Sequence, residues 1–413
     1  MFSKSWCGVV EVALPRNGMS VLRRRYVTLG LVSMFTLFLI PVSVGDASVN
    51  YSYVLLPLLM FAVTGNLRRP PIFLLQLMAL YVAIFLLAAT YQQSLYGDYL
   101  RRIVSFAIFM SLFSYMFVRI NDQMVLAFKV SIVAISFGLS VSSAYLFFAS
   151  GGSAVLGFEA KDLVGSQRVG FVYLMAIWVA YLYQAPNRIL SLIKFSTILI
   201  VLIGLFLTFS RSSVVALIAS FIVFASTGLA SWLKRPNLLG VWKSLGVIVG
   251  LGLLLYLLES LVPLTFKFFG ERLFAFLQDS NAVSSDLGDV DSSGGTRIAL
   301  LEAIANFVAR NPLTGSGFLG VWVMPDSPAG SAHNEYADVL FRTGIPGILS
   351  FAYLLFRTAR FLYIKDSGLF WGFFGVLCYG LFHETFKESQ GGFILAMLFG
   401  LMSQSANEYG VRK

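Results

Sequence analysis

Charged residues are scarce in this chain of 413 residues. Asp, Glu, Lys and Arg together make up only 12% of it, and 58% of the residues are hydrophobic. Soluble domains carry about a quarter charged residues. A water-soluble protein of this composition would have too little polar surface to present to solvent. The composition therefore excludes an ordinary soluble domain and predicts a membrane protein.

Cysteine and histidine are almost absent. Cys7 precedes the first apolar run and Cys378 lies inside a late one, so a disulfide is not expected. The histidines, His333 and His383, are far apart and lack cysteine partners, which argues against zinc. The acidic stretch 279–295 lacks the spacing of a calcium-binding loop. Neither a Walker loop nor a dinucleotide-binding fingerprint occurs, so we expect no metal and no cofactor.

Long apolar runs dominate instead. A helix needs roughly 20 apolar residues to cross a bilayer. The first run, 26–44, is too long for a signal peptide and lacks a small-residue cleavage site after it, so we interpret it as an uncleaved span. We expect an all-α polytopic membrane protein with about twelve spans: 26–44, 49–65, 71–90, 103–118, 130–149, 169–183, 195–209, 213–231, 244–261, 344–362, 368–382 and 391–405.

The basic residues predict the orientation of these spans. With the N-terminus inside, 19 of the 30 basic residues but only 4 of the 20 acidic ones fall on the inner side. The inner segments then carry a net charge of +15 and the outer segments −5. Because cytoplasmic loops are enriched in Lys and Arg, both termini are predicted to be cytoplasmic. The basicity is thus a signal of topology, and we expect no nucleic-acid partner.

Residues 263–343 form the only long gap between apolar runs, and this orientation places them outside. The predicted organisation is spans one to nine in 1–262, an external loop in 263–343 and three further spans in 344–413. Within this region the sequence indicates an acidic, mobile stretch, a short helix and a segment rich in Gly and Pro that contains His333. These parts are 279–295, 296–310 and 311–347 respectively.

The short helix places an arginine on its apolar face. Thr296 is suited to cap the helix, and Asn311-Pro312 to end it. At about 100° per residue, Arg297 shares a stripe with three apolar residues. A buried cation needs a partner, which is either an external carboxylate or an anionic ligand such as phosphate. The apolar members of the stripe are Leu301, Ile304 and Val308, and the opposite face holds Glu302, Asn306 and Arg310.

Two more arginines lie at outer membrane borders. Arg211 interrupts an apolar stretch of over 30 residues, and Arg168 precedes the sixth span. A charge at such depth is expected to face the bundle interior or a water-filled cavity. A snorkelling anchor is the alternative, and it suits Arg168 better than Arg211. Together with Arg297, they suggest an anionic ligand bound from the external side.

His333 lies in the sequence Ser-Ala-His-Asn-Glu-Tyr-Ala-Asp. Since the pKa of histidine suits neutral pH, it could accept a proton from a hydroxyl nucleophile. A hydrogen-bonding loop histidine is the other interpretation. His383-Glu384 is interpreted as an interfacial polar pair. The turn Gly315-Ser-Gly317 could cradle a phosphate with its amides, although such turns are common.

These motifs resemble the core of the O-antigen ligase and polymerase superfamily. The resemblance rests on an arginine-headed helix, an Asn-Pro-Leu-x-Gly-x-Gly turn, and a His-Asn pair followed nine residues later by Gly-x-x-Gly. An upstream Ser-Arg pair also resembles the family. The Arg168-Val-Gly-Phe element matches in part, but the Asn-Pro-Asn that often follows it is absent. The matching residues are Arg297, Asn311 to Phe318, His333-Asn334, Gly344 to Gly347 and Ser210-Arg211.

The resemblance implies a glycosyltransferase with a GT-C-like fold in the bacterial inner membrane. Its donor would be an undecaprenyl-diphosphate-linked oligosaccharide, which needs neither nucleotide nor metal. Arg211 and Arg297 would stabilise the diphosphate, and His333 would orient or deprotonate the acceptor hydroxyl. Arg168, Asn334, Gly315 and Gly317 would help to bind substrate at the periplasmic face. A chain-length regulator or a flippase would be a protein partner.

Two activities within the superfamily share every motif. We expect a polymerase of O-antigen or exopolysaccharide repeat units, by a slight preference over a ligase that transfers glycan to lipid A core or to protein. A flippase or transporter is less expected, because such proteins commonly show pseudo-symmetric halves, which are not evident here. A peptidoglycan polymerase would rely on an acidic loop residue rather than on His333.

Overall fold

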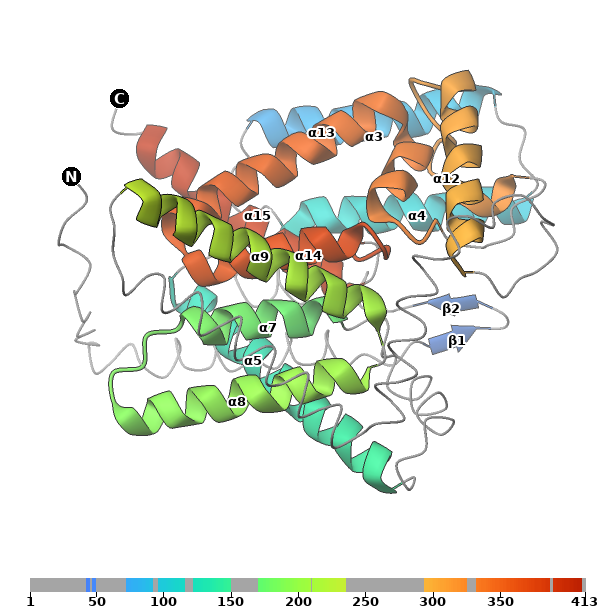
Figure 1. The fold of residues 1–413 in the computed structure, drawn as a ribbon. Coiled ribbons are helices and arrows are strands. Elements are labelled where there is room, and N and C mark those ends of the chain that lie inside the picture. The colour runs from blue at the N-terminus through green and yellow to red at the C-terminus, as the bar shows by residue number, and fades with distance from the viewer. Residues whose placement is uncertain are drawn as a thin grey trace.

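The computed structural model describes residues 42–44, 47–49, 72–91, 96–115, 122–149, 170–208, 210–234, 293–324, 332–386 and 389–410. Helices dominate these residues (Figure 1). Their bounds are α3 Ile72–Tyr91, α4 Tyr96–Tyr115, α5 Asp122–Ala149, α7 Gly170–Leu182, α8 Arg188–Leu207, α9 Arg211–Lys234, α12 Ser293–Arg310, α13 Glu335–Lys365, α14 Ser367–Gly380 and α15 Ser389–Gly410, with a 3-10 turn at Val321–Val323.

A small antiparallel hairpin of β1 (Val42–Val44) and β2 (Ala47–Val49) precedes the helices. The sequence prediction extended a helix through residue 44 and began the next at 49, and it was wrong at these two ends. Alternating Val and Ser favour strands, and Gly-Asp between them suits a tight turn. The rest of the first two expected spans, and all of 244–261, lie outside the described residues.

The other nine expected spans each coincide with a helix. Within the described part of the chain, four helices are long and apolar enough to cross a membrane, and four shorter apolar helices accompany them. The prediction of a helical membrane protein is confirmed in this respect. The long ones are Ile72–Ala89, Val125–Ala149, Arg188–Leu207 and Glu335–Lys365; the shorter ones are Gly170–Leu182, Ser212–Thr227, Ser367–Gly380 and Gly391–Met402.

Helix α7 lies at the centre of the helical group. Every residue from Gly170 to Ala180 is buried. Helix α7 packs against α5, α8, α9 and α14, which explains why it is apolar on all sides. Its first residue approaches α9 and α14 so closely that a Cβ on Gly170 would lie 2.0 Å from Ser213 Oγ and 3.1 Å from Tyr379 Oη.

Helix α13 is two helices joined at a kink. Gly344 has φ 67° and ψ −168°, which interrupts the helix between 335–343 and 345–365. The sequence prediction assigned 335–343 to a turn-rich loop, whereas these residues are helical. Ala337, Val339 and Phe341 are buried, and the Gly and Pro residues at 344–347 mark the kink rather than a loop.

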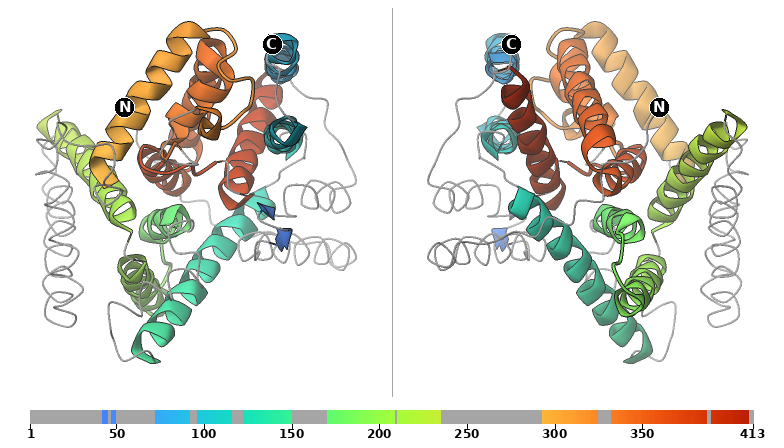
Figure 2. Two further views of the ribbon diagram at one scale, coloured as in Figure 1. Left: turned by 90° about the vertical axis from the view of Figure 1, so that its right-hand side faces the viewer. Right: turned by 90° about the vertical axis from the view of Figure 1, so that its left-hand side faces the viewer.

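Helix α12 runs across one end of the helical group (Figures 1 and 2). It begins at Ser293, so Thr296 is not its cap as predicted, and it ends at Arg310 before Asn311-Pro312 as predicted. The predicted apolar stripe was wrong at Leu301, which is 40% exposed. Its buried stripe is Leu300, Ile304 and Val308, which packs against Val321, Ala332, Ala337 and Phe341.

Candidate functional site

The segment that carries His333 is fastened to the end of α14. The Ala332 amide donates to Glu384 Oε1 at 2.6 Å, and the Phe386 amide donates to Glu335 Oε2 at 2.9 Å. Asn334 Nδ2 donates to the carbonyl of Leu381 at 2.9 Å. These three contacts, here called the clasp, join residues 332–335 to residues 381–386. They fix the backbone on both sides of His333.

His333 itself has a left-handed backbone with φ 50°. This conformation costs about 1–2 kcal/mol for a residue with a Cβ, and it persists only where the surroundings enforce it. The clasp supplies that enforcement, and the apolar stripe of α12 packs against Ala332 from the other side. The His333 side chain is half-buried. The backbone of this half-buried residue is therefore strained and held in place by its neighbours.

Asn334 has both polar side-chain groups engaged within the protein. Its Oδ1 accepts from the Ala337 amide at 3.0 Å and caps α13, while Nδ2 makes the contact with Leu381. Asn334 was predicted to bind substrate. Both contacts hold Asn334 beside His333, and the role of Asn334 in substrate binding stays a prediction.

The turn 311–318 packs onto the kink of α13. The Ser316 amide donates to the Phe341 carbonyl at 2.7 Å, and the Phe318 amide to the Arg342 carbonyl at 2.9 Å. A Cβ on Gly315 would lie 2.2 Å from the Phe341 carbonyl oxygen, and one on Gly344 would lie 2.6 Å from that of Pro312. Glycine is thus required by close approach of two backbones and by positive φ.

These bonds argue against the predicted phosphate cradle. The Gly315 amide donates to the Asn311 carbonyl at 2.9 Å, and the Gly317 amide to the Thr314 carbonyl at 3.1 Å. With the Ser316 amide also engaged, the three donors of the turn face the protein itself. Gly315 and Gly317 therefore shape the scaffold and do not offer their amides to a ligand.

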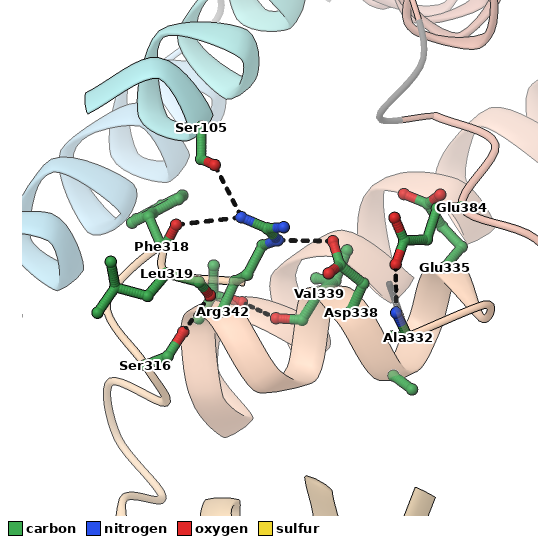
Figure 3. Close-up of polar contacts among 12 residues, drawn as sticks. Ser105, Ser316, Phe318, Leu319, Ala332, Glu335, Asp338, Val339, Arg342 and Glu384 are labelled. Atoms are coloured by element: carbon green, nitrogen blue, oxygen red, sulfur yellow. Dashed lines mark hydrogen bonds and ion pairs between the residues drawn. The ribbon is translucent and has the colours of Figure 1, made fainter. Parts of the chain in front are cut away.

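Arg342 holds the turn to α13 and α4 (Figure 3). Its Nε donates to Asp338 Oδ2 at 2.7 Å, and one terminal nitrogen donates to Ser105 Oγ at 2.8 Å and to the Phe318 carbonyl at 3.1 Å. Arg342 and Asp338 are 3% and 2% exposed. The sequence analysis missed this pair. Its signal was the spacing of four residues, which places the two charges on one helix face.

Phe318 anchors the same turn against α3 and α4. Its ring is completely buried and packs edge-on against Phe106 and Phe109 of α4, with centroid distances of 5.3 Å each. Tyr81 and Phe85 of α3 complete the contact at 6.1 and 6.2 Å. The turn is therefore interlocked with α3 and α4.

Arg211 is the first residue of α9, beside a cluster of hydroxyl groups. Ser213 Oγ donates to Ser210 Oγ at 2.8 Å, and the Ser213 amide also donates to Ser210 Oγ, at 3.4 Å. Ser213 adjoins Gly170 and Tyr379, and the Tyr379 ring stacks on His383 with centroids 4.8 Å apart. The start of α9 thus lies at the same end of the helical group as the clasp.

The structure describes the three predicted arginines to different extents. Arg168 lies outside the described residues. Arg211 and Arg297 lie in α9 and α12, but the structure describes only their backbone. Helix α12 packs on Ala332, and α9 begins beside the end of α14 that holds the clasp, so both helices border the His333 segment. Their predicted role as an anion site stays a prediction.

Glu384 had been interpreted as half of an interfacial polar pair with His383. Its contact with Ala332, 52 residues earlier in the chain, gives it a role in holding the His333 segment. Sequence spacing carried no signal for this contact, since the two residues meet only when α13 and α14 pack together. Among the described residues, no three potential metal ligands gather in one place.

Comparison with known proteins agrees with the motifs. No curated protein matches the chain significantly. Residues 195–352 match the family model described as O-antigen ligase. The match runs from α8 to the first part of α13 beyond its kink, and it includes Arg211, Arg297 and His333. It confirms that this chain resembles the O-antigen ligase and polymerase superfamily.

Proposed function

We propose that the chain is a membrane glycosyltransferase that joins polyprenyl-diphosphate-linked oligosaccharide repeat units into O-antigen or exopolysaccharide. The observation that carries the proposal is the clasp, which presents His333 in a strained backbone conformation beside the helices that bear Arg211 and Arg297. Strained residues that the surroundings over-determine cluster at functional sites. The family match supplies the class of reaction.

His333 is the proposed base. A hydroxyl of the acceptor sugar attacks the anomeric carbon of the donor, and its proton passes to the imidazole. The bond between that carbon and the diphosphate oxygen breaks, and the polyprenyl diphosphate leaves with the electron pair. Attack from the opposite face inverts the anomeric configuration. The products are a glycan longer by one transferred unit and free polyprenyl diphosphate.

Arg211 and Arg297 are the proposed partners of the leaving diphosphate, with Arg168 as a further contact. Guanidinium groups match phosphate oxygens through paired donors and stabilise the negative charge that develops as the bond breaks. This charge stabilisation needs no metal ion or nucleotide. The external segments carry a net charge of −5 in the expected topology, so a cluster of three arginines there favours binding of an anion.

The finer topology belongs to the same proposal. About twelve spans in a GT-C-like arrangement would lie in the bacterial inner membrane with both termini in the cytoplasm. The His333 end would then face the periplasm, where a flippase delivers lipid-linked glycans and a chain-length regulator can act. The excess of basic residues on the opposite side supports this orientation.

A ligase is the second candidate, because the matching family model is described as O-antigen ligase. A ligase would use the same donor, the same arginines and the same base. It would differ in its acceptor, which would be lipid A core or a protein rather than another lipid-linked glycan. The described residues contain no feature that separates these acceptors.

A gel of surface glycans from a strain that lacks the gene tests the proposal. Loss of the ladder with one repeat unit still attached to lipid A core indicates a polymerase. Loss of all attached glycan with intact core indicates a ligase. Loss of attached glycan with precursor that accumulates at the inner face would instead indicate a flippase and contradict the glycosyltransferase proposal.

Expression of variants in the same strain tests the site. Arg297→Ala and His333→Ala are each expected to abolish the product while the protein stays in the membrane at normal abundance. Arg297→Lys keeps the charge but loses the paired donors, and it is expected to restore activity only in part. Wild-type glycan ladders from both alanine variants would contradict the assignment of the site.

A further inference from the structure

We infer that Glu335 and Glu384 are positioning residues that hold His333 in its reactive orientation, which rests on the proposed function. The two carboxylates are neighbours in the structure (Figure 3). Each carboxylate accepts a hydrogen bond from a backbone amide in the segment that carries the other carboxylate. Glu384 accepts from the Ala332 amide, and Glu335 accepts from the Phe386 amide. The two contacts are reciprocal, and they enclose His333 between fixed points one residue before it and two residues after it.

Burial makes these contacts strong. A hydrogen bond in the low-dielectric interior of a protein is stronger than the same bond in water. Glu335 is only 3% exposed, and Ala332 is equally buried, so water competes poorly for these groups. The combined contacts can therefore hold a residue whose left-handed backbone costs about 1–2 kcal/mol. Without them, His333 would relax to negative φ and its imidazole would swing to another direction.

The partner segment 381–386 is itself rigid enough to serve as the fixed side. Thr385 and Phe386 are buried, and the first turn of α15 lies against them. A Cβ on Gly391 would lie 1.9 Å from the Thr385 carbonyl oxygen, which shows how closely the backbones approach. The ring of Tyr379, which precedes the segment, stacks on His383 within it. Through the clasp, the positions of α14 and α15 therefore constrain the position of His333.

Substitution of Glu384 tests the inference, since Glu384 is half-buried and tolerates change better than Glu335. Purified protein in proteoliposomes is assayed with a polyprenyl-diphosphate-linked repeat unit. We expect Glu384→Ala to lower kcat about 10- to 100-fold, the cost of a base displaced by about 1 Å, with KM for the donor unchanged. Glu384→Gln keeps an oxygen that accepts the Ala332 amide, and it should retain most of the activity.

A second measurement probes the accessibility of His333 without an activity assay. Diethyl pyrocarbonate modifies exposed neutral imidazoles, and mass spectrometry separates the peptides of His333 and His383. The modification rate of His333 should change in Glu384→Ala and return to the wild-type value in Glu384→Gln. An unchanged His333 rate in Glu384→Ala would overturn the inference. Glu302→Ala, which alters an exposed carboxylate on α12, is the matched control and should leave both kcat and the modification rate unaltered.

The double variant separates this inference from the proposed function. If Glu384 acts through His333, adding Glu384→Ala to His333→Ala lowers the residual rate no further. If His333→Ala were inactive and Glu384→Ala fully active, the positioning role of Glu384 would be refuted and the proposed function would stand. A fully active His333→Ala would refute the proposed site itself. If Glu384→Gln were as inactive as Glu384→Ala, the carboxylate charge and not the hydrogen bond would be required, which also contradicts positioning.

Discussion

Two segments that carry family motifs, the turn 311–318 and the His333 segment 332–335, use the same unusual backbone for different ends. Each contains a non-glycine residue with positive φ, Phe318 at 71° and His333 at 50°. Phe318 is completely buried in a ring of aromatic side chains, whereas His333 is half-buried and held by polar contacts on both sides. The turn builds the scaffold, and the clasp holds the residue that we propose as the base.

The two segments use the polar groups of their motif residues in different ways. The amides of Gly315 and Gly317 donate to carbonyls within the turn, and the Ser316 amide donates to Phe341 of α13, so this motif encodes a fit between two backbones. In the His333 segment the backbone amide of Ala332 and the side chains of Asn334 and Glu335 bond to residues 381–386 after α14, and they hold the backbone on both sides of His333. Variants of the turn should therefore change stability, and variants of the clasp should change activity.

The largest expected effect is on activity at His333. His333→Ala should lower glycan transfer by about 100-fold or more, since a general base contributes about 10²–10⁴-fold. The thermal unfolding temperature in detergent should change little, because the side chain is half-buried and alanine keeps the Cβ at this positive φ. Transfer assays and unfolding curves on the same preparation check both statements. A large drop in unfolding temperature would place His333 with the scaffold.

The largest expected effect on stability is at Arg342. Arg342→Met leaves the buried Asp338 carboxylate without its counter-ion, which typically costs about 3–5 kcal/mol. Adding Asp338→Leu removes the orphaned charge and should recover much of the loss. Denaturant titration in detergent measures both. Equal destabilisation by the single and double variants would show that the guanidinium acts through Ser105 and the Phe318 carbonyl instead.

A smaller effect is expected at the kink. Gly344→Ala meets backbone atoms at 2.6 to 2.9 Å and a positive φ, so it should destabilise by at least about 1–2 kcal/mol. Gly138→Ala in α5 is the control, because nothing lies within 4 Å of its added methyl group. That control should be neutral or stabilising by about 0.5–1 kcal/mol. Equal effects of the two substitutions would contradict the close packing of turn and kink.

The smallest effect is expected far from both segments. Lys129 of α5 forms an ion pair with Asp366 at the junction of α13 and α14, and both side chains are about a quarter exposed. Lys129→Ala should cost no more than about 1 kcal/mol, as for other solvated pairs, and should leave glycan transfer unchanged. Loss of transfer in this variant would mean that the activity is not confined to the His333 end.

Much of the helical framework could be predicted from hydropathy, because a span needs about 20 apolar residues whatever its neighbours are. Local breakers such as Asn311-Pro312 located the end of α12. The buried face of α12 was misplaced at Leu301, since the neighbouring surface decides which apolar residue is covered. Residues 335–343 were assigned to a loop because Gly344 and Pro346 signal a break, and a break inside a kinked helix looks the same in sequence.

The candidate site, too, could be predicted only in part from the sequence. His333 stood out because histidine is rare in the chain and its pKa suits proton transfer. Glu384 and Arg342 did not stand out, since their roles depend on contacts between α13, α14 and α4 that form only on packing. Gly315 and Gly317 were assigned to ligand binding because a glycine turn has the same sequence whether it encloses a phosphate or another backbone.

Incubation of the purified protein with a polyprenyl-diphosphate-linked repeat unit in proteoliposomes tests the central claim most directly. Without nucleotide or added metal, the account predicts free polyprenyl diphosphate together with lipid-linked glycans of two or more repeat units, or glycan on lipid A core when that acceptor is supplied. Unchanged donor with every acceptor supplied, under conditions in which the protein is folded, would contradict it.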